Sequence, residues 1–318
     1  MRALTPPGTA VSARRFAAFR IFFGAYLALW IASLAPWARE LFGDDGIPGL
    51  PGAAPSQLPG PLAWLLPSHL PGALAAWAVG GVAVLALLVA AGVARRAAAL
   101  GVWLGLVWLY DRNPGLHNPS LGYLGWICLA LAVSPPGEPA RLAARRANDP
   151  AWRFPPGLFA GAWWILALAY TVSGLDKLSS LAWTQGHAIR WALDLPWARP
   201  GPLRDALLAL PEGAVAALTW GVLATELLFA PLALVRALRP WVWLAALGLH
   251  VGLAGAMAFP QLSIGMAMAH LFTFDERWLA RRTPRGVDTP ERRGQAGEPR
   301  APGPPAEGSF HERGKGLP

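Results

Sequence analysis

Residues 72–93 read GALAAWAVGGVAVLALLVAAGV, a run without charged side chains and without proline. A helix over this run is about 33 Å long at about 1.5 Å per residue, and the hydrocarbon core of a bilayer is about 30 Å thick. Arg95 and Arg96 follow almost directly, and such side chains mark the point where a span reaches water. The run predicts a membrane-spanning helix, and the rest of the chain is interpreted around it.

The composition of the whole chain agrees with this prediction. Of its 318 residues, 54% are hydrophobic and 14% are charged, and the mean hydropathy is +0.38. A soluble domain has about 25% charged residues. The 17 tryptophans fit the aromatic belts of a membrane protein. Cys128 is the single cysteine, which excludes an intrachain disulfide and leaves the redox compartment open.

The net charge of +9 could indicate a nucleic-acid-binding protein. Such a protein gathers its basic residues on one face. The arginines instead lie between the apolar runs and near the carboxyl end. This is the placement that sets the orientation of a membrane protein. We therefore expect membrane lipid, and no nucleic acid, as a partner.

We predict an all-α, polytopic transmembrane bundle of about eight spans. Residues 1–15 form a basic amino-terminal arm, residues 16–280 the transmembrane domain, and residues 281–318, rich in Pro, Gly, Arg and Glu, a disordered tail. The predicted spans are residues 16–36, 72–93, 97–110, 119–134, 156–175, 213–235, 240–259 and 261–274. The third and fourth are short; the third covers only about 21 Å by the helical rise.

The basic residues of the short loops predict the orientation. With eight spans they all fall on one side, which is then the cytoplasm and holds both termini and the tail. They are Arg14, Arg15, Arg95, Arg96, Arg141, Arg145, Arg146, Arg153, Arg236, Arg239, Arg281 and Arg282. Residues 37–71, rich in Pro and Gly, and residues 178–212, with several tryptophans, then lie outside on the membrane surface. The arginine, alanine and glycine usage predicts the inner membrane of a bacterial cell.

The segment YTVSGLDKLSSLAWTQGHAI, residues 170–189, contains Lys177, one of only two lysines among 27 basic residues. A lysine, unlike an arginine, can lose its proton when it is partly buried. Two interpretations are open: a helix-end lysine that reaches the membrane interface with its charge, or a catalytic amine. Asp176 is its neighbour, and His187 follows ten residues later.

Two ionisable residues lie within predicted spans, where an uncompensated charge costs roughly 2.5–3.5 kcal/mol. Glu226 is roughly 20 Å deep from the outside and His250 roughly 15 Å deep from the inside by the helical rise. In antiparallel neighbouring helices they would lie within about one turn of each other. They form either a structural hydrogen bond or part of a site.

His117 lies in the external loop DRNPGLHNP, residues 111–119, and loops carry function more often than spans. The alternative is that His117 is a solvent-exposed loop residue without a functional role. His187 is either part of a site beside Lys177 or an interfacial residue. No HExxH, CxxC or carboxylate cluster with ligand spacing occurs, so we predict no metal site.

Three segments in this order resemble the HTTM domain, the membrane part of vitamin K-dependent γ-glutamyl carboxylase. They are LYDRNPGLHNPSLGYLG (109–125), YTVSGLDKLSSLAWTQG (170–186) and LGLHVGLAGAMAFPQLSIGM (247–266). The second is similar to the family pattern G-x-x-K-L followed by W-x-x-G. The resemblance covers about residues 12–280 and is that of a stand-alone bacterial member.

The resemblance implies catalytic roles for Lys177, His117 and His250. Lys177 would be the base that deprotonates a reduced naphthoquinone of the vitamin K or menaquinol type, and the two histidines would orient substrate or stabilise negative charge. The oxygenated quinol would then remove a γ-proton from a glutamate, which takes up carbon dioxide. Glu226 would support His250, and Asp176 and His187 would be supporting residues.

On this interpretation the chain is a quinol-dependent, carboxylase-like lyase that acts on a peptide or small acid at the exoplasmic face. The other interpretation is a membrane protein without enzymatic activity, which keeps the fold and serves as an assembly, peptide-maturation or transport partner. A secreted peptide or a membrane protein would be its partner in either case.

Overall fold

The computed structural model describes residues 11–50, 52, 56, 58–139, 152 and 154–278. The chain divides into two compact units, Met1–Asp275 and Glu276–Pro318. Of the second unit, only the short helix η4 (Glu276–Trp278) is described. Most of the predicted basic arm, the basic loop with Arg141, Arg145, Arg146 and Arg153, and the predicted tail lie outside the described residues.

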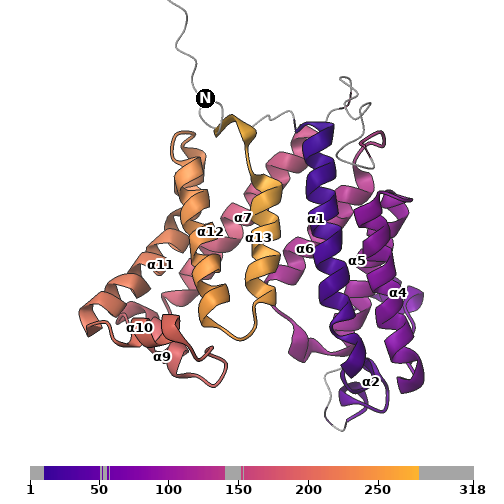
Figure 1. Ribbon diagram of the computed structural model, residues 1–318, viewed down its shortest axis with the longest axis horizontal. Helices are drawn as coiled ribbons and strands as arrows, with labels where there is room; N and C mark the ends of the chain where they lie inside the picture. Colours follow the sequence, from indigo (N-terminus) through magenta and orange to yellow (C-terminus); the bar gives the residue numbers. More distant parts are fainter. Residues whose placement is uncertain are drawn as a thin grey trace, which may run out of the picture. The chain divides into compact units, whose positions relative to one another are not determined.

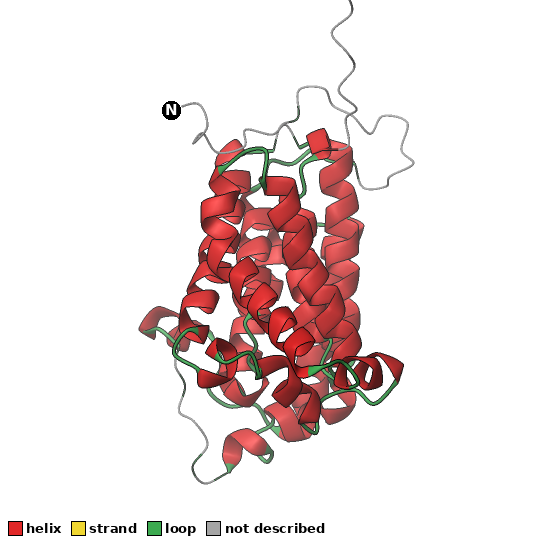
Figure 2. Ribbon diagram, turned by 90° about the vertical axis from the view of Figure 1, so that its left-hand side faces the viewer, coloured by secondary structure: helices red, strands yellow, loops and turns green. Residues whose placement is uncertain are grey.

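The first unit is built from helices, and its described part contains no strand (Figure 2). Each predicted span corresponds to a helix, so the all-helical prediction is confirmed. These helices are α1 (Ala13–Ala32), α4 (Gly72–Ala91), α5 (Arg95–Arg112), α6 (Ser120–Val133), α7 (Pro156–Lys177), α11 (Glu212–Leu234), α12 (Arg239–Ala256) and α13 (Gln261–Thr273). Their boundaries follow chemistry, since apolar runs continue until proline, glycine or a turn stops them.

Short helices interrupt the two long predicted external segments and the loop between α5 and α6. They are η1 (Ala35–Trp37), α2 (Ala38–Phe42), η2 (Ile47–Gly49), α3 (Gly60–Leu65), η3 (Pro114–Leu116), α8 (Leu181–Thr184), α9 (Ala188–Asp194) and α10 (Pro202–Leu208). Proline occupies the first turn of several, where its missing N–H is not needed. Helices α2, α9 and α10 lie at the end opposite to the start of α1 (Figure 1).

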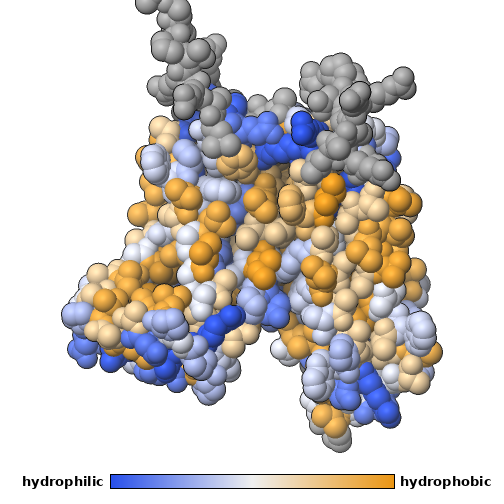
Figure 3. Space-filling model, viewed as in Figure 1, coloured by the Kyte–Doolittle hydropathy of each residue, from blue (hydrophilic) through white to orange (hydrophobic). Residues whose placement is uncertain are grey.

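Among the described helices, four are long and apolar enough to cross a membrane: the first, within Ala13–Gly49, then α4, α7 and α11. Protein covers only part of their apolar surface, since Leu29 on α1 is 74% exposed and Trp77 on α4 is 80% exposed. Hydrophobic residues cover the middle of the molecule and hydrophilic ones gather toward its two ends (Figure 3). These features are consistent with an integral membrane protein.

Helix α5 is longer than the predicted span 97–110. It has 18 residues and begins at Arg95, which makes it about 27 Å long. The Arg95 side chain is buried and donates hydrogen bonds to the carbonyls of Ser134 (3.0 Å) and Pro135 (2.8 Å). Its Nε lies 2.5 Å from Oε1 of Glu138. Because these partners compensate the guanidinium, the helix includes a charged residue that the sequence placed outside it.

Arg20 joins α1 to the end of α4. Its side chain is 0% exposed, and Nη1 donates to the carbonyls of Val89 and Ala90 at 2.6 Å each. These are among the last carbonyls of α4, which lack a partner within their own helix. The two helices approach closely at Gly24, where an added Cβ would lie 2.5 Å from the backbone nitrogen of Ala90.

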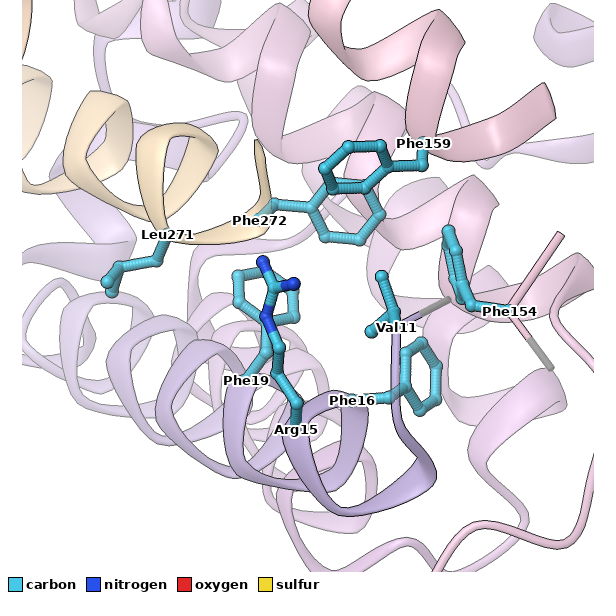
Figure 4. Close-up of a pocket in the computed structure, with 8 residues that line it drawn as sticks. All are labelled: Val11, Arg15, Phe16, Phe19, Phe154, Phe159, Leu271 and Phe272. Atoms are coloured by element: carbon cyan, nitrogen blue, oxygen red, sulfur yellow. The ribbon is translucent and has the colours of Figure 1, made fainter. Parts of the chain in front are cut away.

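An aromatic cluster closes the same end of the bundle (Figure 4). Phe272 of α13 contacts the rings of Phe19, Trp126 and Phe154 edge-on, with centroids 5.0–5.6 Å apart. The guanidinium of Arg15 lies 6.0 Å from the ring centroid of Phe159 at the start of α7. The starts of α1 and α7 and the end of α13 therefore meet at this end, and the cavity that they leave is only about 10 Å³.

Neighbouring helices form a closed series in the first unit. Helix α1 packs on α4, α4 on α5, α5 on α6, and α6 on α13; α13 packs on α12 and α7, and α12 and α7 both pack on α11. The helices α7, α11, α12 and α13 therefore form a ring in which each packs on two of the others. Four of the predicted site residues lie in this group: Asp176, Lys177, Glu226 and His250.

Candidate functional site

Lys177, the last residue of α7, pairs with Glu226 of α11. Its Nζ lies 2.7 Å from Oε2 of Glu226 and donates a second hydrogen bond, also of 2.7 Å, to the hydroxyl of Ser173. The Lys177 and Glu226 side chains are 21% and 12% exposed. The ring of Trp183 covers the amine, with its centroid 5.1 Å from Nζ. A lysine and a carboxylate are thus held together in a mostly buried place, beside one aromatic face.

The local sequence explains why α7 and α11 lie so close here. Gly174 has no Cβ, and an added one would lie 2.7 Å from the backbone nitrogen of Leu227. Pro231 lies inside α11 and has no N–H to donate to the carbonyl four residues earlier, that of Leu227. Thr171 of α7 fills this gap: its hydroxyl accepts from the N–H of Ala230 (3.0 Å) and lies 3.4 Å from the Leu227 carbonyl.

His250 takes part in a second cluster, built around Tyr170. Nε2 of His250 lies 2.7 Å from the Tyr170 hydroxyl, and Nε2 of His270 lies 2.9 Å from the same oxygen. The three residues come from α12, α7 and α13. His270 is 0% exposed and Tyr170 is 6% exposed. One hydroxyl therefore joins two imidazoles inside the bundle.

Tryptophans hold this cluster in place from the other side. The indole N–H of Trp243 donates to the carbonyl of His270 (3.0 Å), and that of Trp163 donates to the carbonyl of Thr273 (2.9 Å). These carbonyls lie in the last turn of α13, beyond which the helix has no N–H groups to offer them. The hydrogen bonds therefore hold the end of α13, and His270 with it, against α12 and α7.

The two clusters lie one above the other on the α7–α11 contact. Tyr170 stacks on Phe229, with ring centroids 4.7 Å apart. Phe229 follows Glu226 by three residues on α11, which is about one helical turn. Tyr170 precedes Lys177 by two turns, or about 10 Å along α7. Helix α7 thus contributes one member to each cluster, Lys177 to the charged pair and Tyr170 to the hydroxyl–imidazole chain.

The expectation that Glu226 supports His250 is wrong. Glu226 pairs with Lys177, and the hydrogen bond of His250 goes to Tyr170. Helix α11 runs obliquely across the bundle (Figure 1), and Glu226 meets Lys177 at the end of α7. Depth along an axis also does not say which neighbour a side chain faces.

His117 lies apart from Lys177 and His250. It is exposed and lines a cavity of about 570 Å³ between α5 and α6. Aromatic and aliphatic side chains form most of the wall, and neither Lys177 nor His250 belongs to it. The residues that line it include Trp103, Tyr110, Asp111, Gly122 and Trp126. The structure thus places the three predicted catalytic residues in three different surroundings: Lys177 beside Glu226, His250 beside Tyr170, and His117 at a cavity of its own.

The two other predicted supporting residues are exposed. The backbone carbonyl of Asp176 accepts from the Ser179 hydroxyl at 2.7 Å. His187 stacks on Trp191, with centroids 5.7 Å apart. Neither has a described contact with Lys177. Within the described ranges, no three His, Cys, Asp or Glu side chains are grouped as metal ligands would be.

Tyr170, Ser173 and His270 also belong to these clusters and were not predicted from the sequence. For the first two, the spacing from Lys177 was the available signal. Residues 170, 173 and 177 are three and four apart, which places them on one face of a helix with Lys177. Nothing in the sequence marks His270 in the same way.

No family model, curated protein or solved structure matches the chain. The resemblance to the HTTM domain therefore rests on the three sequence segments alone, and the function is argued from the geometry of the site.

Proposed function

We propose that the chain is an integral membrane protein of eight spans, with both termini in the cytoplasm of a bacterial cell and the bundle in its inner membrane. The grouping of basic residues supports this orientation. Arg14, Arg15, Arg95 and Arg96 lie at the starts of α1 and α5, Arg236 lies between α11 and α12, and Arg239 begins α12. Positive charge near helix ends favours the cytoplasmic side. Lys177 then lies toward the exoplasmic side.

Within this bundle we propose an HTTM-like enzyme whose base is the Lys177–Glu226 pair, acting on a peptide or small acid at the exoplasmic face. The observation that carries the proposal is the pair itself. A chain that uses arginine almost everywhere has a lysine here, and that lysine is mostly buried against one carboxylate. Ionisable residues in membrane segments mark functional sites.

The pair can act as a base because its two members can share one proton. When the proton moves from Nζ to Oε2 over 2.7 Å, both groups become neutral and the amine gains a lone pair. Lys177 can then accept a proton from an acidic group beside it, while Glu226 holds the first proton. Ser173 accepts a hydrogen bond from the amine and keeps it in place. Because both side chains are mostly buried, water stabilises the charged pair less than it would at the surface.

The surroundings of the amine fit a reduced naphthoquinone. The face of Trp183 lies 5.1 Å from Nζ, and a second flat ring can stack on such a surface. When bound, this group would supply the acidic hydroxyl that donates the proton. Lys177 would receive the proton, and Trp183 would orient the ring.

The cavity at His117 is a second place of suitable size. Its volume of about 570 Å³ exceeds that of a bicyclic ring, but Lys177 does not line it. The proposal assigns the ring to the Lys177 side, and the experiment distinguishes the two places.

A binding titration tests the proposal. A short-chain menaquinol is added without oxygen to detergent-purified, full-length protein, and the quenching of tryptophan fluorescence is followed. We expect saturable binding that weakens at least tenfold in Lys177→Ala and in Glu226→Gln. Glu212→Gln, the same change at the exposed start of α11, is the matched control and should bind like the wild type.

The cavity variant Gly122→Phe completes the set. An added Cβ at Gly122 meets no atom within 4 Å, so a large side chain there fills the cavity without a backbone clash. Normal binding in this variant supports the Lys177 side. Loss of binding only in Gly122→Phe would move the ring to the cavity and overturn the role of Lys177. No binding to the wild type would favour the non-enzymatic membrane partner.

A further inference from the structure

The chain His250–Tyr170–His270 has a proton count that determines how its members can bond. A tyrosine hydroxyl carries one proton, and a neutral imidazole carries one proton on one of its two nitrogens. Both ring nitrogens that face the hydroxyl are Nε2 atoms, at 2.7 and 2.9 Å. For both contacts to be hydrogen bonds, one histidine accepts from the hydroxyl and the other donates to it. The two histidines therefore hold opposite tautomers.

The tautomers also determine the protonation of the two outer nitrogens, the Nδ1 atoms. In the tautomer that accepts at Nε2, the proton is on Nδ1; in the tautomer that donates at Nε2, Nδ1 has a free lone pair. Nδ1 of His250 and Nδ1 of His270 are both buried, and neither has a hydrogen-bond partner among the described residues. Buried polar atoms of native proteins usually bond to protein or to ordered water. One of the two Nδ1 atoms is therefore an unused hydrogen-bond donor, and the other is an unused acceptor.

We propose that His250, Tyr170 and His270 form a proton relay between two buried water molecules, one at each Nδ1 atom. A hydronium ion at the entry position gives a proton to the free Nδ1 of one histidine and becomes water, while the Nε2 proton of that histidine passes to the Tyr170 oxygen. The hydroxyl proton passes to Nε2 of the other histidine, and the Nδ1 proton of that histidine leaves to the second water. One proton enters and one leaves, no residue keeps a charge, and the histidines exchange tautomers.

The position of the relay gives it a use. Phe229, which stacks on Tyr170, is about one turn from Glu226 on α11. A base that accepts a proton in a buried place must release it before the next cycle. The relay provides a route for that proton through the interior of the bundle. This use rests on the proposed function, whereas the relay itself rests on the three side chains.

Nitrogen NMR of the full-length protein in lipid nanodiscs, with ¹⁵N-labelled histidine and no ligand, tests the relay. The signals of His250 and His270 are assigned with His250→Asn and His270→Asn. We expect opposite tautomers at low temperature, and averaging of the two signals as the temperature rises, because the relay exchanges the tautomers. Tyr170→Phe should abolish the averaging. Tyr123→Phe, which removes a nearby hydroxyl from α6, should leave it unchanged.

Three results would overturn the relay. They are the same tautomer at both histidines, opposite tautomers that never average, and a stoichiometric metal ion that is lost in Tyr170→Phe. The wild-type spectra decide the first two even if Tyr170→Phe does not fold. The NMR sample contains no quinol, so a failed menaquinol titration does not contradict the relay. In the same way, histidine tautomers that do not exchange would not contradict the Lys177–Glu226 proposal.

Discussion

Removing either charge of the Lys177–Glu226 pair should destabilise the protein, and removing both should destabilise it no further. Lys177→Met leaves a mostly buried carboxylate without its cation, and Glu226→Gln leaves a mostly buried ammonium without its anion. In the double variant neither uncompensated charge remains. The comparison is a double-mutant cycle, which isolates the energy of the pair from that of each side chain.

The exposure of the pair sets the magnitude. Breaking a fully buried pair costs about 3–5 kcal/mol, and an exposed pair contributes about 0–1 kcal/mol. The two side chains are 21% and 12% exposed, so each single variant should lose about 2 kcal/mol of unfolding free energy. This corresponds to about a thirtyfold change in the unfolding equilibrium. The coupling energy should also be about 2 kcal/mol, because the double variant loses no more than a single one.

Unfolding of the purified protein by dodecyl sulfate in mixed micelles, followed by helical circular dichroism, measures these energies. The pair Arg39–Asp45 is the control, since its side chains are 69% and 43% exposed and its atoms are 2.6 Å apart. Its coupling should be well below 1 kcal/mol. Losses at Lys177 and Glu226 that simply add would show that the two charges do not compensate each other. The site would then lack its base.

Two further predictions follow from the packing and from the outer loop. Gly174→Ala should push α7 away from α11 and weaken menaquinol binding. Gly24→Ala should destabilise the α1–α4 contact and leave binding to the remaining folded protein unchanged. Equal effects of the two variants on binding would contradict the site. At Asp44, desolvation opposes ionisation, but the Leu70 N–H and the Arg112 guanidinium outweigh it and lower the pKa below its usual value of 3.8. This stabilisation is present above about pH 4 and is lost as the pH falls through the lowered value, so Asp44→Asn should reduce the thermal midpoint more at pH 7 than at pH 3.

The helices of the bundle could be predicted because each depends on a continuous apolar run with chemically marked ends. The boundary of α5 could not, because it depends on distant groups. Arg95 enters the helix only because the carbonyls of Ser134 and Pro135, and the carboxylate of Glu138, receive its guanidinium. A sequence shows that an arginine is present and does not show that its partners lie 40 residues away.

Individual residues of the candidate site could be predicted, but the partners with which they pair could not. Lys177, Glu226 and His250 are recognisable because each is an ionisable group in or beside an apolar segment. Which of them meet depends on the rotation of four helices about their axes, and an apolar face contains little information on that rotation. His270 could not be predicted for the same reason.

The polar contacts themselves supply the information on rotation that the apolar surfaces lack. Lipid is as apolar as a leucine side chain, so helices in a membrane gain little by turning one apolar face rather than another inward. A lysine, a glutamate or a histidine does distinguish the faces, because each must meet a partner on another helix. The pair and the hydroxyl–imidazole chain together join α7, α11, α12 and α13. The residues that carry the proposed chemistry therefore also orient the helices that hold them, and only isosteric changes such as Glu226→Gln and Tyr170→Phe can separate the two roles.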